Sequence, residues 1–191
     1  MSEKTGKLVI ISAPSGTGKG TVINELLKLR PDFVFSVSAT TRKPRPGEVD
    51  GIAYHFITEH RFKEMSDNNE FLEYAEYIGE FYGTPAKPVD ECINSGITIL
   101  LDVEVQGAKQ VMQKKPDALS IFITPPDMRE LENRLRGRGT DSEEKLIARL
   151  KRAQIELEEK SNYNYIIVND DASRAANEIL TIIDNNDRKD K

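Results

Sequence analysis

The segment LVIISAPSGTGKGTVINELL, residues 8–27, places glycines and a lysine between an apolar strand and a helix. The run LVIIS has the short, β-branched character of a buried strand, and the apolar residues after Gly20 recur at helical spacing. Gly16 and Gly18 let the backbone curl so that successive N–H groups point inward, and the following helix adds its positive N-terminal end. Such a turn suits phosphate, and Lys19 lies where an ammonium reaches the outer phosphates of a nucleotide.

This turn (the phosphate nest, residues 13–21) follows the pattern G-x-x-x-x-G-K-[ST] with two departures. Ala13 replaces the first glycine, which is a mild change, and Gly20 replaces the serine or threonine after Lys19. The hydroxyl that often ligates Mg²⁺ is therefore missing at this position, although Thr21 offers one a residue later. We expect a metal ion to be held mainly by phosphates and water, and its direct protein ligands stay unknown.

A second basic segment, SVSATTRKPRPGEVDGIAYHF at residues 36–56, carries Arg42, Lys43 and Arg45 in a loop stiffened by prolines. It can be interpreted as an exposed connector whose charges only solvate it. Hydroxyl donors around the arginines favour a phosphate clamp instead, because a forked guanidinium matches a phosphate with two hydrogen bonds. These donors are Thr40, Thr41 and Tyr54. A chain with both elements can hold a donor nucleotide and a phosphorylated acceptor together.

The order of apolar runs predicts the elements that position these residues. The runs LVIIS, FVFSVS, ITILLDV, LSIFI and YIIVN are predicted strands, separated mostly by segments with helical periodicity. The alternation predicts an α/β fold with a parallel sheet of about five buried strands flanked by helices. Two segments interrupt this alternation of strands and helices. Residues 38–85 are expected to form a small antiparallel subdomain, and residues 134–152 are expected to form two helices suited to a lid. The core is then residues 1–37, 86–133 and 153–191.

Composition excludes several classes of protein. Charged residues make up 31% of the 191 residues and the net charge is −5, with no basic block suited to nucleic acid or to an anionic membrane. No apolar run approaches the ~18 residues of a membrane span and the start MSEKTGK is not signal-like, so we expect a cytoplasmic protein. Cys92 is the only cysteine, and His55 and His60 are too few for a histidine metal site. The oligomeric state stays unknown.

The chain resembles the guanylate kinases from about Lys7 to Ile183. The resemblance rests on the motifs APSGTGKGT, SVSATTRKPRPGEVDG, FLEYAEYIGEFYGTP, ILLDVEVQGA, IFITPPD, RLRGRGTDSEE and YIIVNDD, which occur in this order. It implies an enzyme that transfers the γ-phosphoryl group of ATP to GMP, and also to dGMP, giving ADP and a guanosine diphosphate. It also implies Mg²⁺ bound with ATP, and a P-loop fold with a core, a GMP-binding subdomain (residues 38–85) and a helical lid (residues 134–152).

By this resemblance, the GMP-contacting positions are Ser38, Arg42, Arg45, Tyr54, Glu73, Tyr82, Thr84, Asp102 and Glu104. The chemistry agrees for Glu73, because guanine presents two adjacent donors that a carboxylate accepts together, whereas adenine presents an acceptor at N1. Ser38 and Thr84 would donate to the guanine oxygen. Asp102, at the end of a predicted strand, would orient Mg²⁺ and its waters, or else is only a strand-end cap. Glu104 stands where many relatives have aspartate.

The resemblance also assigns an ATP site and catalytic residues. The ATP-binding set is Ala13, Pro14, Ser15, Gly16, Thr17, Gly18, Lys19, Gly20, Thr21, Arg138 and Asn169; the catalytic set is Lys19, Arg42, Arg134, Arg138 and Arg149. Arg134 and Arg138 lie four residues apart and so share a helix face. They are either a solvated basic face or lid arginines that swing over the transferring phosphoryl group. Asn169 would lie near the adenine, with Arg138 as a candidate to stack on it.

Other functions stay open from the sequence. Domains similar to guanylate kinases also serve as non-catalytic peptide-binding scaffolds, and fold alone does not exclude that role. A kinase for a different monophosphate is disfavoured by Glu73 and its hydroxyl partners. If residues 38–85 hold GMP and the lid carries arginines, we expect closure when both nucleotides bind, with Gly137 and Gly139 as hinge candidates.

Overall fold

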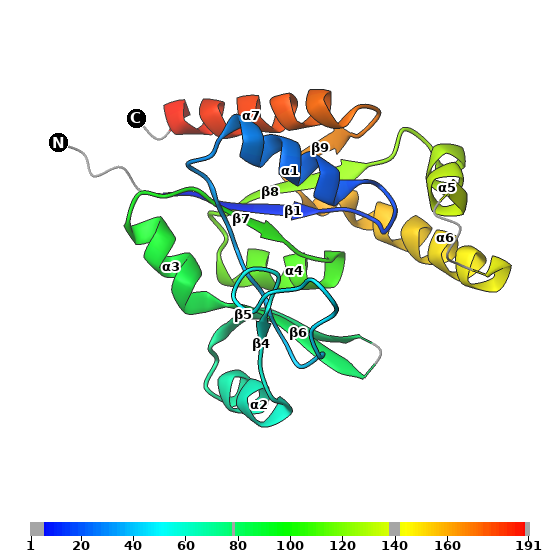
Figure 1. The fold of residues 1–191 in the computed structure, drawn as a ribbon. Coiled ribbons are helices and arrows are strands. Elements are labelled where there is room, and N and C mark those ends of the chain that lie inside the picture. The colour runs from blue at the N-terminus through cyan, green and yellow to red at the C-terminus, as the bar shows by residue number, and fades with distance from the viewer. Residues whose placement is uncertain (1–5, 78, 138–141, 190–191) are drawn as a thin grey trace. The chain divides into compact units, whose positions relative to one another are not determined.

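The computed structural model describes residues 6–77, 79–137 and 142–189 (Figure 1). The chain falls into two compact units. Unit 1 consists of the residues up to Leu8, Phe33–Leu101 and Gln106–Ala118; unit 2 consists of Val9–Asp32, Asp102–Val105 and the residues from Leu119 onward. Within the described ranges, no helix is long and apolar enough to cross a membrane. The expected division into core, subdomain and lid stays a prediction.

The predicted strands form a five-stranded sheet in the order β2-β7-β1-β8-β9. The strands are β1 (Leu8–Ser12), β2 (Val34–Phe35), β7 (Ile99–Asp102), β8 (Leu119–Thr124) and β9 (Tyr165–Val168). β8 pairs in parallel with β1 and with β9, and β2 pairs in parallel with β7. The predicted α/β fold with a parallel sheet is therefore confirmed.

The expectation that all five strands are buried is wrong for the two edge strands. β2 is two residues long rather than the whole run FVFSVS, and its Val34 and Phe35 are each 37% exposed. In β9, Ile166 is 45% exposed and Val168 is 42% exposed. An edge strand has a neighbour on one side only, so its side chains are covered less than those of a central strand.

In unit 2, the helices α1 (Lys19–Leu29) and α7 (Ala172–Lys189) pack against each other (Figure 1). α1 buries Val22, Ile23 and Leu26, and the neighbouring strands β1 and β8 are buried along their lengths. Each such apolar side chain stabilises the fold by roughly 1.5–3 kcal/mol when fully buried. Arg30, just after α1, donates to Asp184 of α7 at 2.9 Å. The turn between β1 and α1 therefore joins a buried strand to a helix that packs against α7.

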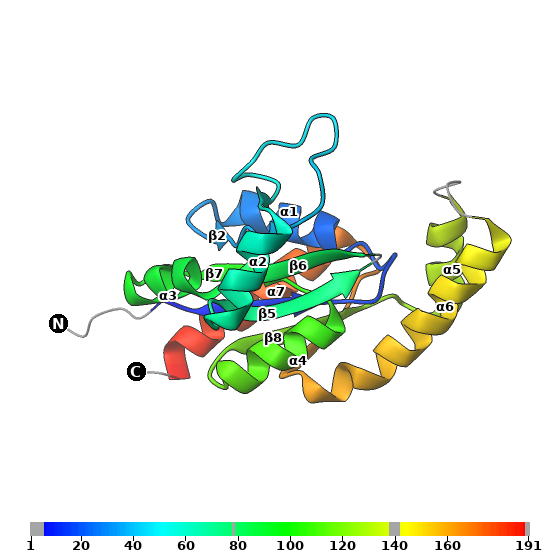
Figure 2. The ribbon, with the colours of Figure 1, turned by 90° about the horizontal axis from the view of Figure 1, so that it is seen from below.

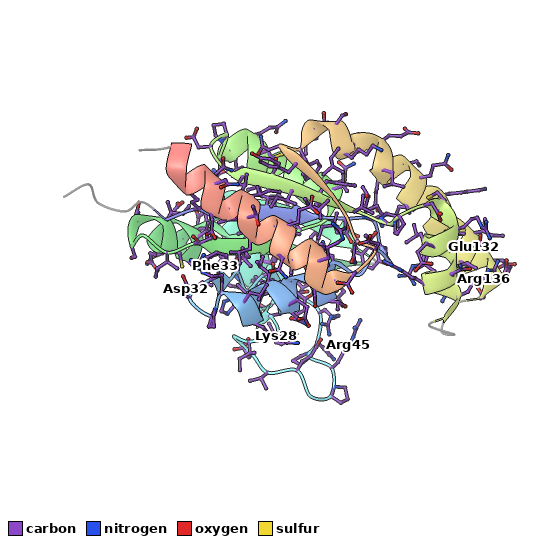
Figure 3. The ribbon with its side chains drawn as sticks, turned by 90° about the horizontal axis from the view of Figure 1, so that it is seen from above. Lys28, Asp32, Phe33, Arg45, Glu132 and Arg136 are labelled. Atoms are coloured by element: carbon purple, nitrogen blue, oxygen red, sulfur yellow. The ribbon has the colours of Figure 1, made fainter. Side chains whose placement is uncertain are left out.

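Unit 2 also contains the helix pair α5 (Met128–Gly137) and α6 (Glu143–Glu158), followed by a short 3₁₀ helix, η1 (Glu159–Asn162). Their shared core consists of Leu131, Leu135, Leu146 and Ala153. α5 begins after Asp127, whose carboxylate accepts the Glu130 N–H at 2.7 Å. Arg136 lies beside Glu132 on α5 (Figure 3) and donates to Glu143 of α6 at 2.7 Å. An apolar contact and an ion pair therefore join these helices.

Unit 1 contains a four-stranded sheet in the order β4-β3-β6-β5. Its strands are β3 (Ala39–Thr40), β4 (His55–Phe56), β5 (Phe71–Tyr77) and β6 (Glu80–Pro85), and the helices of this unit are α2 (Glu59–Asp67), α3 (Ala86–Asn94) and α4 (Val105–Lys114). β5 and β6 are antiparallel, as predicted for residues 38–85. Phe62 of α2 stacks on Phe71 of β5 with ring centroids 4.5 Å apart. α4 runs alongside β5 (Figure 2).

Candidate functional site

The turn between β1 and α1 has the backbone geometry of a phosphate-binding loop. Gly16 has a φ of +95° and Gly18 a φ of +91°, both in the left-handed region that favours glycine. A Cβ on Gly16 would lie 2.6 Å from Leu135 Cδ2, and a Cβ on Gly18 would lie 2.8 Å from Asn169 Nδ2. Any side chain at these positions would therefore strain the backbone and collide with a neighbour.

Lys19 is the first residue of α1, and its ammonium is anchored at the end of β7. Among the described residues, no side chain caps the start of α1, so this end of the helix presents its positive pole. Lys19 Nζ forms an ion pair with Asp102 and donates to the backbone oxygen of Val103 at 3.0 Å. A phosphate bound in the nest would compete with this carboxylate and this carbonyl for the ammonium.

Arg134 and Asn169 both hold the backbone oxygen of Thr17 in the nest. Arg134 Nη1 donates to this oxygen at 3.0 Å, and Asn169 Nδ2 donates to it at 2.7 Å. The other Arg134 nitrogens donate to Glu130 Oε1 at 2.8 Å and to the backbone oxygen of Asn169 at 3.0 Å. Arg134 therefore shapes the nest in this structure. Its expected contact with a transferring phosphoryl group, and the expected place of Asn169 near adenine, stay predictions.

Arg149 reaches the nest from α6. Its Nη2 donates to Ser15 Oγ at 2.7 Å, and its side chain is partly buried. A guanidinium in this position can add a hydrogen bond and a charge to a bound phosphate. Two further sequence predictions, for Arg138 and Gly139, lie outside the described residues. Gly137, the other hinge candidate, is the last residue of α5.

One acidic residue beside the nest, Asp102, fits the expected Mg²⁺ ion. In the part of the chain that the structure describes, no group of three or more His, Cys, Asp or Glu side chains could hold a metal ion. Asp102, whose side chain is 32% exposed, is the carboxylate beside Lys19. Magnesium in such sites is bound by one or two carboxylates together with phosphates and water, and this donor set matches that description.

In unit 1, a buried carboxylate lies between two strands. Glu73 of β5 is 8% exposed and pairs across the sheet with Thr84 of β6, which is 1% exposed. Thr84 Oγ1 donates to Glu73 Oε1 at 2.7 Å, so its proton is directed at Glu73 rather than at a ligand. Tyr82 is on the same face of β6 as Thr84, because alternate residues of a strand share a face. A buried carboxylate is stabilised by hydrogen-bond donors, so Glu73 is a candidate to read a ligand that presents such donors.

Arg42 is held by Glu48 within the loop that follows β3. Its two terminal nitrogens donate to the two Glu48 oxygens, each at 2.9 Å. The hydrogen bond from Arg42 lowers the pKa of the Glu48 carboxyl, and the hydrogen bond to Glu48 raises the pKa of Arg42, so both groups are charged at neutral pH. The guanidinium lies over the Tyr54 ring, 5.4 Å from its centroid, and Tyr54 meets Tyr82 edge-on at 5.9 Å. Arg45, exposed on the same loop (Figure 3), donates its backbone N–H to Glu48 at 2.7 Å.

The expected GMP residues are divided between the two units. The strands and loop of unit 1 carry Ser38, Arg42, Arg45, Tyr54, Glu73, Tyr82 and Thr84. Asp102 and Glu104 belong to unit 2. Glu104 is exposed and accepts a hydrogen bond from Arg152 of α6 at 2.7 Å. Its contact with a guanine base therefore stays a prediction.

Known proteins resemble this chain over almost its whole length. The guanylate kinase family model matches residues 5–186. The chain belongs to the guanylate kinase family. A guanylate kinase of Prochlorococcus marinus is 50% identical over 177 residues, which are 93% of this chain and 96% of that protein. One of Streptococcus thermophilus is 51% identical over 185 residues, which are 96% of this chain and 88% of that protein.

The similarity extends to solved structures. The crystal structure of guanylate kinase from Anaplasma phagocytophilum gives a TM-score of 0.77 at 35% identity, and the match covers 96% of this chain and 87% of that chain. The sequence resemblance to guanylate kinases and the predicted fold class are thus both confirmed.

The sequence interpretation missed two residues that matter for this guanylate kinase family member. Glu48 neutralises Arg42, and the available signal is a carboxylate close in sequence to the arginines of a basic loop. Gly107 in α4 lies so close to Glu73 that a Cβ there would be 2.6 Å from Glu73 Oε2. The available signal is a glycine near the start of a predicted helix, where other residues are favoured.

Proposed function

We propose that this protein transfers the γ-phosphoryl group of ATP to GMP, giving ADP and GDP. The family match supports the proposal, as do the names of proteins about half identical to this chain over most of their length. The observation that carries it is the buried Glu73 carboxylate in unit 1, in a chain that also has a phosphate nest with Lys19.

The base of the nucleotide that receives the phosphoryl group follows from the hydrogen bonds that the Glu73 carboxylate can accept. Guanine offers N1–H and the exocyclic amine side by side, and a carboxylate accepts both, whereas adenine would set its N1 lone pair against the carboxylate. Arg42 and Arg45, with the hydroxyls of Tyr54 and Tyr82, supply the donors for the acceptor phosphate. dGMP is a second expected acceptor, because the guanine edge and the phosphate are common to both nucleotides.

The chemistry needs positioning and charge rather than a proton acceptor. An oxygen of the GMP phosphate forms a bond to the γ-phosphorus while the bond to the β–γ bridging oxygen breaks, and the electron pair of that bond leaves with ADP. The attacking oxygen is already an anion, so no general base is required. Lys19 and the backbone N–H groups of the nest hold the ATP phosphates, and the arginines that neutralise the transition state are Arg42, Arg134, Arg138 and Arg149.

A divalent metal ion would complete the site that holds ATP, the phosphoryl donor. Mg²⁺ bound with ATP supplies positive charge at the phosphate oxygens, and Asp102 is the residue of this chain that would hold it or its waters. Asp102 would then leave its ion pair with Lys19 and bind the metal ion or its waters. A cytoplasmic location is part of the same proposal, because ATP and GMP are the substrates it requires.

A coupled assay of ADP release tests the proposal. The purified protein is given ATP and Mg²⁺ with GMP, dGMP, AMP, CMP or UMP in turn. We expect rapid turnover with GMP and dGMP and only background with the other monophosphates. Binding of GMP without any ADP release would instead favour a non-catalytic domain, and faster turnover with another monophosphate would contradict the assignment of Glu73.

A further inference from the structure

We infer that helix α4 is the positioning element for the guanine-reading carboxylate, acting through Gly107, Gln110 and Lys114; the inference rests on the proposed role of Glu73. These three residues are spaced three and four apart and so lie on one face of the helix. Each meets a different point of β5 in unit 1. Together they fix the strand on both sides of Glu73 and the carboxylate itself.

β5 is irregular just before Glu73. Phe71 pairs with Pro85 of β6 and Glu73 pairs with Thr84, so Leu72 is an extra residue and the register shifts between Phe71 and Glu73. A bulge of this kind re-aims the side chains that follow it. β5 is also the last strand of its sheet, so no further strand of the described sheet holds its outer backbone edge.

Side chains of α4 form hydrogen bonds with this outer backbone edge of β5. Gln110 Oε1 accepts the Tyr74 N–H at 3.3 Å, and Gln110 Nε2 donates to the Tyr74 oxygen at 3.1 Å. Lys114 Nζ donates to the backbone oxygen of Phe71 at 2.9 Å. The bulge is therefore pinned by Lys114 on one side and by Gln110 on the other, with Glu73 between them.

Gly107 sets the position of the carboxylate. A Cβ at this residue would lie 2.6 Å from Glu73 Oε2 and 3.1 Å from Glu73 Cδ. The other oxygen, Oε1, is held by Thr84 at 2.7 Å, so the carboxylate is confined between the Thr84 hydroxyl and the backbone of α4. Glycine is disfavoured within helices, and the close approach explains its presence here.

Gly107→Ala separates a positioning role from a structural one. The colliding atoms are the end of a flexible side chain and alanine favours helix, so Tm should stay within about 4 °C of the parent value. The displaced carboxylate should lower kcat/KM for GMP about tenfold or more, while KM for ATP changes by less than about twofold. Lys109→Ala, an exposed position on the opposite face of α4, is the matched control and should change neither parameter.

A double variant tests whether Gly107 acts through Glu73. Aspartate at position 73 draws the carboxylate back by one methylene, so the added methyl at position 107 no longer meets it. Gly107→Ala in a Glu73→Asp background should therefore cost less than about twofold in kcat/KM for GMP, whereas independent effects would multiply. Gln110→Ala should speed amide hydrogen exchange at Tyr74 and lower kcat/KM for GMP severalfold.

The outcomes separate the inference from the proposed function. If Gly107→Ala matches Lys109→Ala on GMP while Glu73→Gln is impaired, the inference is overturned and the function stands. Multiplying losses in the double variant overturn it as well. If the parent protein does not phosphorylate GMP, the proposed function fails, and the inference fails with it.

Discussion

Glu73→Gln is the sharpest test of how the acceptor base is read. The substitution keeps the size and shape of the side chain but replaces one acceptor oxygen with an NH₂ donor. One of the two adjacent guanine donors then faces a donor in a site where Glu73 is only 8% exposed and water has little access. Thr84 can still donate to the remaining oxygen, so we expect the fold to be kept.

The expected loss combines two effects. Hydrogen bonds to a charged group contribute about 1.5–3 kcal/mol, and a buried donor left without an acceptor costs about 1–3 kcal/mol. The two overlap, so kcat/KM for GMP should fall by about 2–4 kcal/mol, or roughly 30- to 1,000-fold. KM for ATP should change little.

Steady-state kinetics with GMP and IMP would measure this. IMP lacks the exocyclic amine, so it presents only N1–H to residue 73. The parent protein should prefer GMP strongly, and Glu73→Gln should lose most of that preference because its amide nitrogen repels the amine of GMP alone. Equal losses for GMP and IMP, or a matching rise in KM for ATP, would refute the reasoning and make Glu73 a structural residue.

Three further predictions concern the cations. Lys19→Met should leave the fold intact and lower kcat at least about a hundredfold, measured by ADP release beside a thermal melt, because it removes a charge aimed at phosphoryl oxygens; near-normal turnover would contradict the assignment. Arg149→Ala should lower kcat about tenfold or more with little change in KM for GMP, and a purely GMP-dependent loss would place its role elsewhere. Glu48→Gln should raise KM for GMP, because the Arg42 fork loses the carboxylate that orients it. The hydrogen bond from Arg42 lowers the Glu48 pKa, so the ion pair is fully formed above the ordinary pKa of a glutamate and is lost only as the pH falls through the lowered pKa. The effect of Glu48→Gln on KM for GMP should therefore be constant from pH 6 to 8 and become smaller in acid.

Local sequence patterns were sufficient for the elements with strong periodicity. The nest was predictable because left-handed turns need glycine, and both Gly16 and Gly18 have positive φ. The antiparallel pair β5 and β6 was predictable because apolar and aromatic residues recur along this segment at the spacing of antiparallel strands. The parallel sheet followed from the alternation of apolar runs and helices.

Sequence patterns could not supply the partners that meet only in the folded chain. The exposure of Phe35 in β2 depends on which strand lies at a sheet edge, and an apolar run carries no such information. Arg134 was assigned from its place in a motif, but its hydrogen bonds to Thr17 and Asn169 join residues far apart in the chain. The packing of Gly107 on Glu73 is likewise a contact between distant segments.

One cation of each unit has an anionic partner within the protein. Lys19 is paired with Asp102, and Arg42 is paired with Glu48 through both terminal nitrogens. A nucleotide phosphate must therefore share or replace these partners, so binding exchanges one charge-assisted hydrogen bond for another rather than adding a new one. Lys19 then contributes less to ground-state affinity than an isolated cation would. Glu48 also orients the Arg42 fork, so its removal is still expected to raise KM for GMP. The same cations can contribute more in the transition state, because negative charge then develops on phosphoryl oxygens at positions that Asp102 and Glu48 do not occupy. Interactions that are stronger in the transition state than in the ground state are those that accelerate the reaction.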